Sequence, residues 1–221
     1  MKKIIVLLFT ALAFSMAANA QLMTASTYKR KSLNTKLSLN AGYLNSTLKS
    51  DNSSSNANGA YAGVSLNIPL AGGLGIAPGV YYSMLTSKSG DNADILGIPV
   101  SGSSTFMEHA INVPLYLNYG IELASDTRVF LFGGPTFQYG LASKVTLDGS
   151  VGSTSGSRTY NNYDYDDFNR MNVYLGGGMG FQISALQITV GYDYGMMNQY
   201  KGDNATKCHR SNLKLGVGFV F

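Results

Sequence analysis

The sequence predicts an all-β protein, an eight-stranded antiparallel transmembrane β-barrel with short turns at one rim and long loops at the other. Three observations support this fold class: apolar and polar residues alternate along eight segments, the connections alternate in length, and aromatic residues gather at the segment ends. The clearest alternation runs through residues 211–221, where Leu213 and Leu215 share one face and Asn212 and Lys214 the other. A strand between lipid and a polar lumen has this period of two.

Each of the eight alternating segments is about as long as a tilted membrane strand must be. In chain order they are residues 35–44, 60–70, 74–84, 110–119, 128–139, 172–183, 186–196 and 211–221. Their apolar faces include Leu39 and Tyr43 in the first, Val64 and Leu66 in the second, Leu74 and Ile76 in the third, Ile111 and Val113 in the fourth, Val129 and Leu131 in the fifth, Leu175 and Met179 in the sixth, Tyr194 in the seventh, and Leu215 and Val217 in the eighth.

Four prolines lie inside these segments, where each removes a ladder hydrogen bond. They are Pro69, Pro78, Pro114 and Pro135. A closed barrel has no edge strand to hold them, so we expect bulges or locally frayed pairing at these positions.

The connections are short and long in turn. Segments two and three, four and five, and six and seven are joined by short turns within residues 71–73, 120–126 and 184–185. The long connections, rich in Ser, Asn, Asp and Gly as solvated loops are, cover residues 45–59, 85–109, 140–171 and 197–210. In outer-membrane barrels the short turns lie in the periplasm and the long loops outside the cell. We therefore expect an outer-membrane location with both termini periplasmic.

Aromatic residues follow the same topology. Segments that rise to the outer rim end with Tyr43, Tyr82, Tyr139 and Tyr194, and segments that descend end with Tyr119, Phe181, Phe219 and Phe221. Aromatic girdles mark both interfaces of a membrane barrel.

The opposite faces predict a narrow, filled lumen. Their polar residues are Ser65, Asn67, Asn112, Tyr116, Asn118, Thr136, Gln138, Asn172, Tyr174, Gln182, Thr189, Asp193 and Lys214. Eight strands leave room only for side chains, so the inward Tyr residues need inward glycines beside them. The run from Gly176 to Gly180 is therefore interpreted as packing rather than as a phosphate loop. Asp193 and Lys214 lie at similar depth on neighbouring segments, and we predict that they form a charge pair.

The N-terminus predicts export. Lys2 and Lys3 precede an apolar run, and Ala18 and Ala20 offer small residues before a cleavage site. We expect a cleaved signal peptide at residues 1–20, a short periplasmic segment at 21–34 and the barrel at 35–221. The apolar run is too short to span a bilayer, and no membrane helix is expected.

Charge and cysteine content narrow the classes of partner and of covalent cross-link that the chain can have. Without Lys2 and Lys3 the chain carries 14 basic and 12 acidic residues, which implies no nucleic-acid partner. Cys208 is the single cysteine, so no internal disulfide is possible. Its basic neighbours Lys207 and Arg210 favour a reactive thiolate, whereas the simpler interpretation is a tolerated loop thiol.

These residues also carry a resemblance to a known family. The signal peptide through Gln21, the strands at 109–117 (HAINVPLYL) and 129–135 (VFLFGGP), and the terminal 218–221 (GFVF) resemble the small outer-membrane β-barrel proteins common in Bacteroidetes, similar in build to OmpA/OmpX-like and porin-like barrels. The resemblance implies outer-membrane lipid as surroundings. It also implies recognition by the barrel-assembly machinery through the C-terminal strand ending at Phe221.

We consider three functions. The first is a structural anchor that presents extracellular loops to an unknown ligand at the cell surface, and the second is a narrow passive pore for small solutes or ions. The third is an outer-membrane lipid hydrolase or acyltransferase, for which His109 or His209 would serve as the base. No nucleophile motif accompanies either histidine, so the sequence predicts a protein that is not an enzyme and assigns no catalytic residue.

No cofactor or metal site is assigned either. Asp164, Asp166 and Asp167 could hold a divalent cation through oxygen ligands, but the glycine and terminal glutamate of a calcium loop are missing. We interpret this stretch as a solvated loop tip.

Overall fold

The computed structural model describes residues 35–50, 54–70, 72–95, 98–151, 154–164, 168–199 and 208–221. The predicted signal peptide and the segment at 21–34 lie outside the described residues, as do Asp166 and Asp167. None of the helical structure in the described part of the chain is long and apolar enough to cross a membrane.

The described residues form nine strands and one short 3₁₀ helix. These are β1 (Lys36–Lys49), β2 (Ser54–Pro69), β3 (Leu74–Ile95), β4 (Ile98–Ala124), β5 (Thr127–Val151), β6 (Thr154–Asn161), η1 (Asn162–Asp164), β7 (Met171–Ile183), β8 (Leu186–Gly195) and β9 (His209–Val220).

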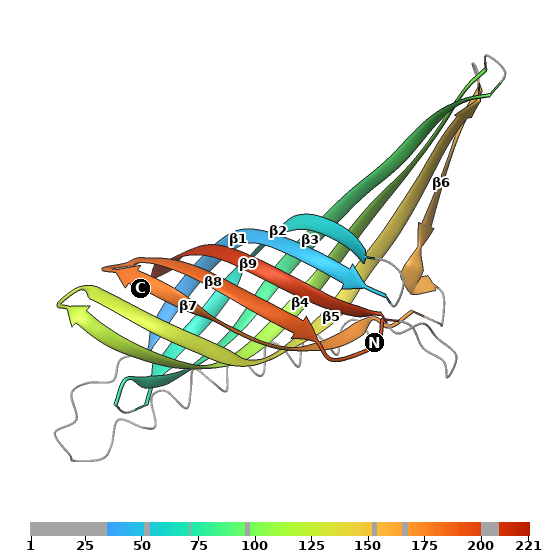
Figure 1. The fold of residues 1–221 in the computed structure, drawn as a ribbon. Helices are drawn as coiled ribbons and strands as arrows, with labels where there is room; N and C mark the ends of the chain where they lie inside the picture. The colour runs from blue at the N-terminus through green and yellow to red at the C-terminus, as the bar shows by residue number, and fades with distance from the viewer. Residues whose placement is uncertain are drawn as a thin grey trace. The chain divides into compact units, whose positions relative to one another are not determined.

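Eight of the nine described strands close into a ring (Figure 1). Each strand pairs antiparallel with its neighbours in the order β1, β2, β3, β4, β5, β7, β8, β9, and β9 returns to β1. The remaining strand, β6, pairs with the far part of β5 and lies outside the ring. The predicted eight-stranded antiparallel barrel is therefore confirmed.

The two ends of the barrel differ as the connection lengths predict. Tight turns join β2 to β3, β4 to β5 and β7 to β8 at one end, which we call the turn end. Gly72 and Gly73 have φ values of 60° and 85°, a backbone conformation that glycine adopts most readily. The last residue also lies at the turn end, where the Phe221 N–H donates to the Leu37 carbonyl at 2.7 Å. The opposite end is called the loop end.

Three of the long connections at the loop end, 45–59, 85–109 and 140–171, are mostly strand, and this corrects the expectation of irregular loops. β3 runs on to Ile95, and β4 begins at Ile98, so residues 85–109 form a long hairpin. β5 likewise runs to Val151 and pairs with β6. These outer parts of β3, β4, β5 and β6 form a four-stranded sheet that we call the extension, visible in Figure 1 where the strands rise past the others. Most of residues 45–59 also belong to β1 and β2.

The lipid-facing surface matches the predicted apolar band. Leu39, Leu117 and Val217, which lie on different strands, leave 47%, 56% and 54% of their surface exposed. Aliphatic side chains exposed this widely around a whole sheet indicate an apolar solvent.

The aromatic girdles also lie where they were predicted. Tyr82 and Tyr139 are both exposed and pair with Ile111 from its two sides, which places them at one level near the loop end. At the turn end, Phe219 and Phe221 are exposed, and their tilted rings have centroids 6.3 Å apart.

Frayed pairing is confirmed at three of the four prolines. The ladder breaks off opposite Pro78 between β2 and β3, opposite Pro114 between β3 and β4, and opposite Pro135 between β4 and β5. A proline has no N–H to give to the ladder, so the pairing resumes only beyond it. Pro69 instead occupies the last paired position of β2.

The bulges lie elsewhere than expected. The register between β4 and β5 shifts between His109 and Ala110, where Leu141 is the extra residue, and again between Glu122 and Ala124 beside the turn. The first shift lies at the loop-end girdle, where the two strands leave the barrel for the extension. A bulge bends its strand and increases the local twist, so it suits this change of direction.

Candidate functional site

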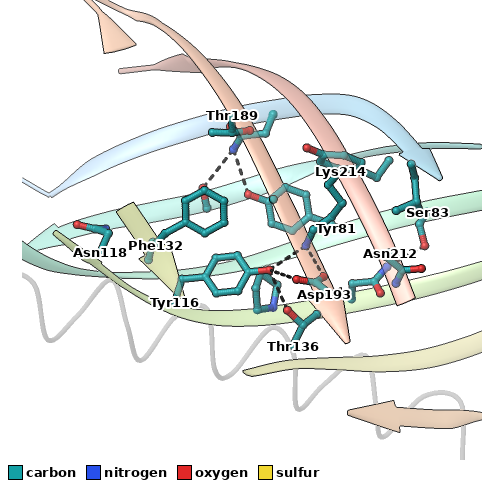
Figure 2. A pocket seen from close by; sticks show the side chains of 18 of the residues that line it. Tyr81, Ser83, Tyr116, Asn118, Phe132, Thr136, Thr189, Asp193, Asn212 and Lys214 are labelled. Carbon is teal, nitrogen blue, oxygen red and sulfur yellow. Dashed lines mark hydrogen bonds and ion pairs between the residues drawn. The ribbon is translucent and has the colours of Figure 1, made fainter. Parts of the chain in front are cut away.

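The lumen holds a hydrogen-bonded network around Tyr116, which projects from β4 (Figure 2). The Lys214 ammonium donates to the Tyr116 hydroxyl oxygen at 2.8 Å and forms an ion pair with Asp193 Oδ2 at 2.5 Å. The Tyr116 hydroxyl also lies 3.0 Å from Thr136 Oγ1 and 3.4 Å from Asp193 Oδ1. Asp193 is only 2% exposed, so its charge is held entirely by neighbours inside the barrel.

The predicted pair between Asp193 and Lys214 is thus confirmed, but the two residues are offset by two positions along the strands instead of lying directly opposite each other. Asp193 pairs directly with Asn212, and Lys214 pairs with Gly191. The contact is therefore diagonal across β8 and β9, and the long lysine side chain spans the offset. Gly176 leaves room for these side chains, because a Cβ at this position would collide with the Asp193 carboxylate.

Little empty volume remains in the lumen. The cavity measures about 110 Å³ and is bordered by Asn40, Tyr81, Asn112, Tyr116, Phe132 and Lys214, among others. Such a space holds a few water molecules. Tyr61 and Tyr81 fill the rest, packed against glycines at 216 and 79 as the sequence predicts. Phe130 and Phe132 add a second group of rings that the sequence interpretation did not place in the lumen.

Two polar bridges cross the lumen between β4 and β9, which lie opposite each other in the ring. The first is the contact of Tyr116 with Lys214, and the second is an ion pair between Glu108 and Arg210 near the loop end. Glu108 is 1% exposed and Arg210 4%. Removing one partner of such a pair would leave a buried, uncompensated charge.

Sequence reasoning missed the bridge between Glu108 and Arg210. Both residues fall within connections that were expected to be loops, so no facing was assigned to them. The signal was nevertheless present, because even-numbered positions of this strand face the lumen from Asn112 onward. Continuing that alternation by two pairs of residues brings Glu108 inside.

A cap of aromatic residues lies at the loop end of the lumen. Tyr163 in η1 is 5% exposed, and its hydroxyl lies against Gly140, where no Cβ would fit. Its ring contacts Phe168 at 5.5 Å between centroids and the Arg170 guanidinium at 5.3 Å. Burial, and secondarily the negative charge of Glu108, raises the pKa of the Tyr163 phenol above its usual range. The phenol is therefore neutral at any physiological pH.

The residues considered for catalysis do not come together. His109 lies on β4 with its Nδ1 2.5 Å from the Tyr82 hydroxyl, and His209 lies on β9 with its Nδ1 3.1 Å from the Gly195 carbonyl. These contacts involve neither a serine hydroxyl nor a carboxylate, and the two histidines are on opposite sides of the ring. The structure thus assembles no nucleophile, base and acid around either described histidine.

The metal and thiol hypotheses involve residues at the loop end. Asp164 accepts a hydrogen bond from Asn161 at 3.1 Å, while the other two aspartates of that stretch lie outside the described residues. Among the described side chains no group of three potential metal ligands occurs. Cys208 is 5% exposed, and its N–H donates to Asn198 at 2.8 Å.

Comparison with known proteins agrees with this geometry. Residues 19–201 match the family described as outer membrane protein beta-barrel domain. The chain therefore belongs to this family of outer-membrane β-barrels. No curated protein matches the sequence.

Several solved structures resemble the chain at low identity. The attachment invasion locus protein Ail of Yersinia pestis, in complex with the heparin analogue sucrose octasulfate, is 13% identical over 85% of this chain and 99% of its own, with a TM-score of 0.46. Neisserial surface protein A is 14% identical over 84% of this chain and 97% of its own, with a TM-score of 0.43. The N-terminal barrel domain of Pseudomonas aeruginosa OprF is 12% identical over 82% of this chain and 97% of its own, with a TM-score of 0.34.

The lumen network predicts strong coupling between Asp193 and Lys214. Asp193→Ala and Lys214→Ala should each destabilise the barrel by about 3 to 5 kcal/mol, because each leaves one buried charge without its partner. The double variant should lose much less than the sum of the two single losses. Urea unfolding from lipid vesicles measures all three free energies.

Lys36→Ala serves as the matched control, since Lys36 is exposed at the turn end and should change stability by less than about 0.5 kcal/mol. Strictly additive losses for Asp193 and Lys214 would contradict the coupling.

Proposed function

We propose that this outer-membrane protein is a structural anchor that presents its loop end, and above all the extension, outside the cell for surface interactions. The observation that carries the proposal is the contrast between the two parts of the molecule. The lumen is filled and capped, whereas β3, β4 and β5 continue far beyond the aromatic girdle with β6 beside them. From Tyr82 to Ile95, β3 alone adds on the order of 40 Å of strand.

The orientation belongs to the same proposal. The loop end would face the medium, and the turn end, with the start of β1 and Phe221, would face the periplasm. Residues 1–20 would be the cleaved signal peptide, residues 21–34 a periplasmic lead-in, and residues 35–221 the barrel domain. An origin in Bacteroidetes, and the absence of catalytic activity, of a cofactor and of a bound metal, stay predictions.

The extension has the features of a recognition surface. β3 and β6 form its two edges and leave backbone N–H and C=O groups available for an added strand. Its faces are rich in hydroxyls that pair across strands, as Ser101 does with Ser150 at 2.7 Å and Thr146 with Thr159 at 3.0 Å. A hollow of about 520 Å³, lined by Ser and Gly residues and by Asp148, lies near the tip. These features support binding of an extracellular ligand by backbone pairing and hydroxyl contacts.

Removing the β3–β4 part of the extension tests this role. Residues 88–105 can be replaced by an Asn-Gly turn, because Ser87 and Phe106 already pair with each other. Cells that display the full protein should bind more features of a glycan and matrix-protein array than cells that display the trimmed variant. Equal binding by both would contradict the proposal.

Labelling of intact cells controls for orientation in that experiment. In a Cys208→Ser background, Ser103→Cys near the tip of the extension should react with a membrane-impermeant maleimide. Ser125→Cys in the turn between β4 and β5 should not react until the outer membrane is opened. The reverse pattern would overturn the orientation.

The filled lumen also supports an anchor over a passive pore. We expect the purified protein in planar bilayers to give no single-channel steps, since the bridges between β4 and β9 and the Tyr163 cap occupy the path. A variant with Tyr116, Phe132 and Tyr163 replaced by Ala should conduct if it inserts. Steps from the wild-type protein comparable to those of the opened variant would favour the pore.

We propose that the barrel-assembly machinery recognises the last strand. Phe221 supports this role because it is 66% exposed and extends the aromatic face of β9 that begins with Phe219. A chain ending at Val220 should reach the membrane several-fold less efficiently, as measured by heat-modifiable protein in outer-membrane fractions. Phe221→Tyr is the control and should assemble normally. Normal assembly of the truncated chain would exclude this recognition.

A further inference from the structure

One face of the extension carries mainly hydroxyl groups. Ser143 of β5 is fully buried, so the alternation of the strand turns the even-numbered positions from 144 to 150 to the opposite, outward side. Thr146, Asp148 and Ser150 therefore share one face, which we call the hydroxyl face. Their neighbour Leu147 points to the other face and is 47% exposed there.

The hydroxyl face is ordered in rows that run across the strands. In the first row, Ser103 of β4 pairs with Asp148, which in turn pairs with Ser157 of β6. The spacing of strands places neighbours in a row about 4.8 Å apart, and the next row lies about 7 Å further along the strands. The second row consists of Ser101, Ser150 and Ser155.

The hollow near the tip of the extension lies over these two rows. The described residues that border its volume of about 520 Å³ are five serines, four glycines and Asp148, and all their side chains belong to the hydroxyl face. Such a volume falls within the range of ligand sites. From Tyr82 in the girdle to Gly90 beside the hollow, β3 advances by about 25 Å, which brings the hollow clear of the lipid headgroups.

The polar groups of the hollow are available to a ligand. Within the described part of the chain, the Asp148 carboxylate makes no ion pair and accepts no side-chain hydrogen bond. Ser101 and Ser150 share one hydrogen bond at 2.7 Å, so one of the two hydroxyls keeps its O–H and both keep lone pairs. Hydroxyls that donate and accept, beside a carboxylate that accepts from two donors at once, suit a ligand rich in hydroxyl groups.

Charge and polarity narrow the class of ligand. Asp148 is the one charged residue among those described at the border of the hollow, and it repels an anionic sugar. Arg158 does not offset it, because β6 turns this side chain to the other face, where it donates to the Tyr160 hydroxyl at 3.3 Å. The described border also offers no apolar side chain to an apolar peptide. An uncharged carbohydrate fits these conditions.

We propose that the hollow binds an uncharged extracellular polysaccharide whose chain runs across β4, β5 and β6. This inference rests on the proposed function, since it names the ligand that the extension would recognise. A hexose unit of an extended polysaccharide is about as long as the spacing between strands, so successive units meet successive strands. Asp148 accepts hydrogen bonds from neighbouring hydroxyls of one unit, and the serines beside it bind the units before and after.

Binding of uncharged linear hexasaccharides to the purified full-length protein in lipid nanodiscs tests the proposal. The panel comprises gluco-, manno- and galacto-hexasaccharides, and nanodiscs avoid competition from sugar-based detergents. Asp148→Ala should weaken binding of the tightest of the three about tenfold, because hydrogen bonds to a charged group are lost. Ser157→Ala removes a neutral partner and should weaken it about threefold. Ser104→Ala is the matched control, since this hydroxyl lies opposite Leu147 on the other face and its loss should leave the affinity unchanged.

Three results would overturn the proposal. They are the absence of binding by all three hexasaccharides, an equal loss of affinity in Ser104→Ala and Asp148→Ala, and tighter binding of an anionic heparin hexasaccharide than of the uncharged ones. Binding of extended peptides that Asp148→Ala leaves unchanged, without hexasaccharide binding, would also contradict it while leaving the surface role of the extension standing.

Failure of the surface role is distinguishable from failure of this inference. Purified protein in nanodiscs exposes both ends of the barrel, so hexasaccharide binding there does not depend on the orientation in the cell. Equal binding by cells that display the full and the trimmed protein, together with Asp148-dependent hexasaccharide binding in nanodiscs, would contradict the surface role alone.

Discussion

The hydrogen-bonded seam between β1 and β9 is the constraint on which the rest of the barrel depends, because it removes the last free edges of the ring. Within a membrane, unpaired backbone N–H and C=O groups cost several kcal/mol each, so a sheet must close on itself. The seam extends from Ser38 with Val220 to Lys49 with His209. The closed ring tolerates the ladder breaks near the prolines. They are short, and continuous pairing resumes on both sides of them.

Closure with only eight strands in turn dictates the contents of the lumen. The space is too narrow for solvent to hydrate charged groups fully, yet the inward faces of the strands are polar. Lys214, Asp193 and Tyr116 therefore pair with one another across strands. Glu108 and Arg210 form a second buried ion pair nearer the loop end. Both bridges connect β4 to strands on the far side of the ring, so they hold the barrel wall together as well as fill it.

The sequence was informative wherever two different solvents meet a strand. Lipid on one face and a polar lumen on the other enforce alternation, which located the eight barrel strands, both girdles and the pairing of Asp193 with Lys214. The extension has water on both faces, so its Ser, Gly and Thr residues carry no period of two and were interpreted as loops. Glu108 and Arg210 were missed for the same reason, since they lie in connections where alternation was no longer sought. The diagonal offset between Asp193 and Lys214 depends on register, which strand ends alone do not determine.

At the loop end, the extension has two open strand edges. Open strand edges in water invite aggregation, and charged residues on edge strands oppose it. Lys88 on β3 and Arg158 on β6 are exposed on the two edges of the extension. Below them, the bulge beside His109 lies where β5 leaves the barrel, and the Tyr163 cap lies at the loop end of the lumen. The interactions that close and fill the barrel thus lie within the membrane band. The extension, which neither lipid nor lumen constrains, is the part of the chain whose side chains the proposed surface interactions would use.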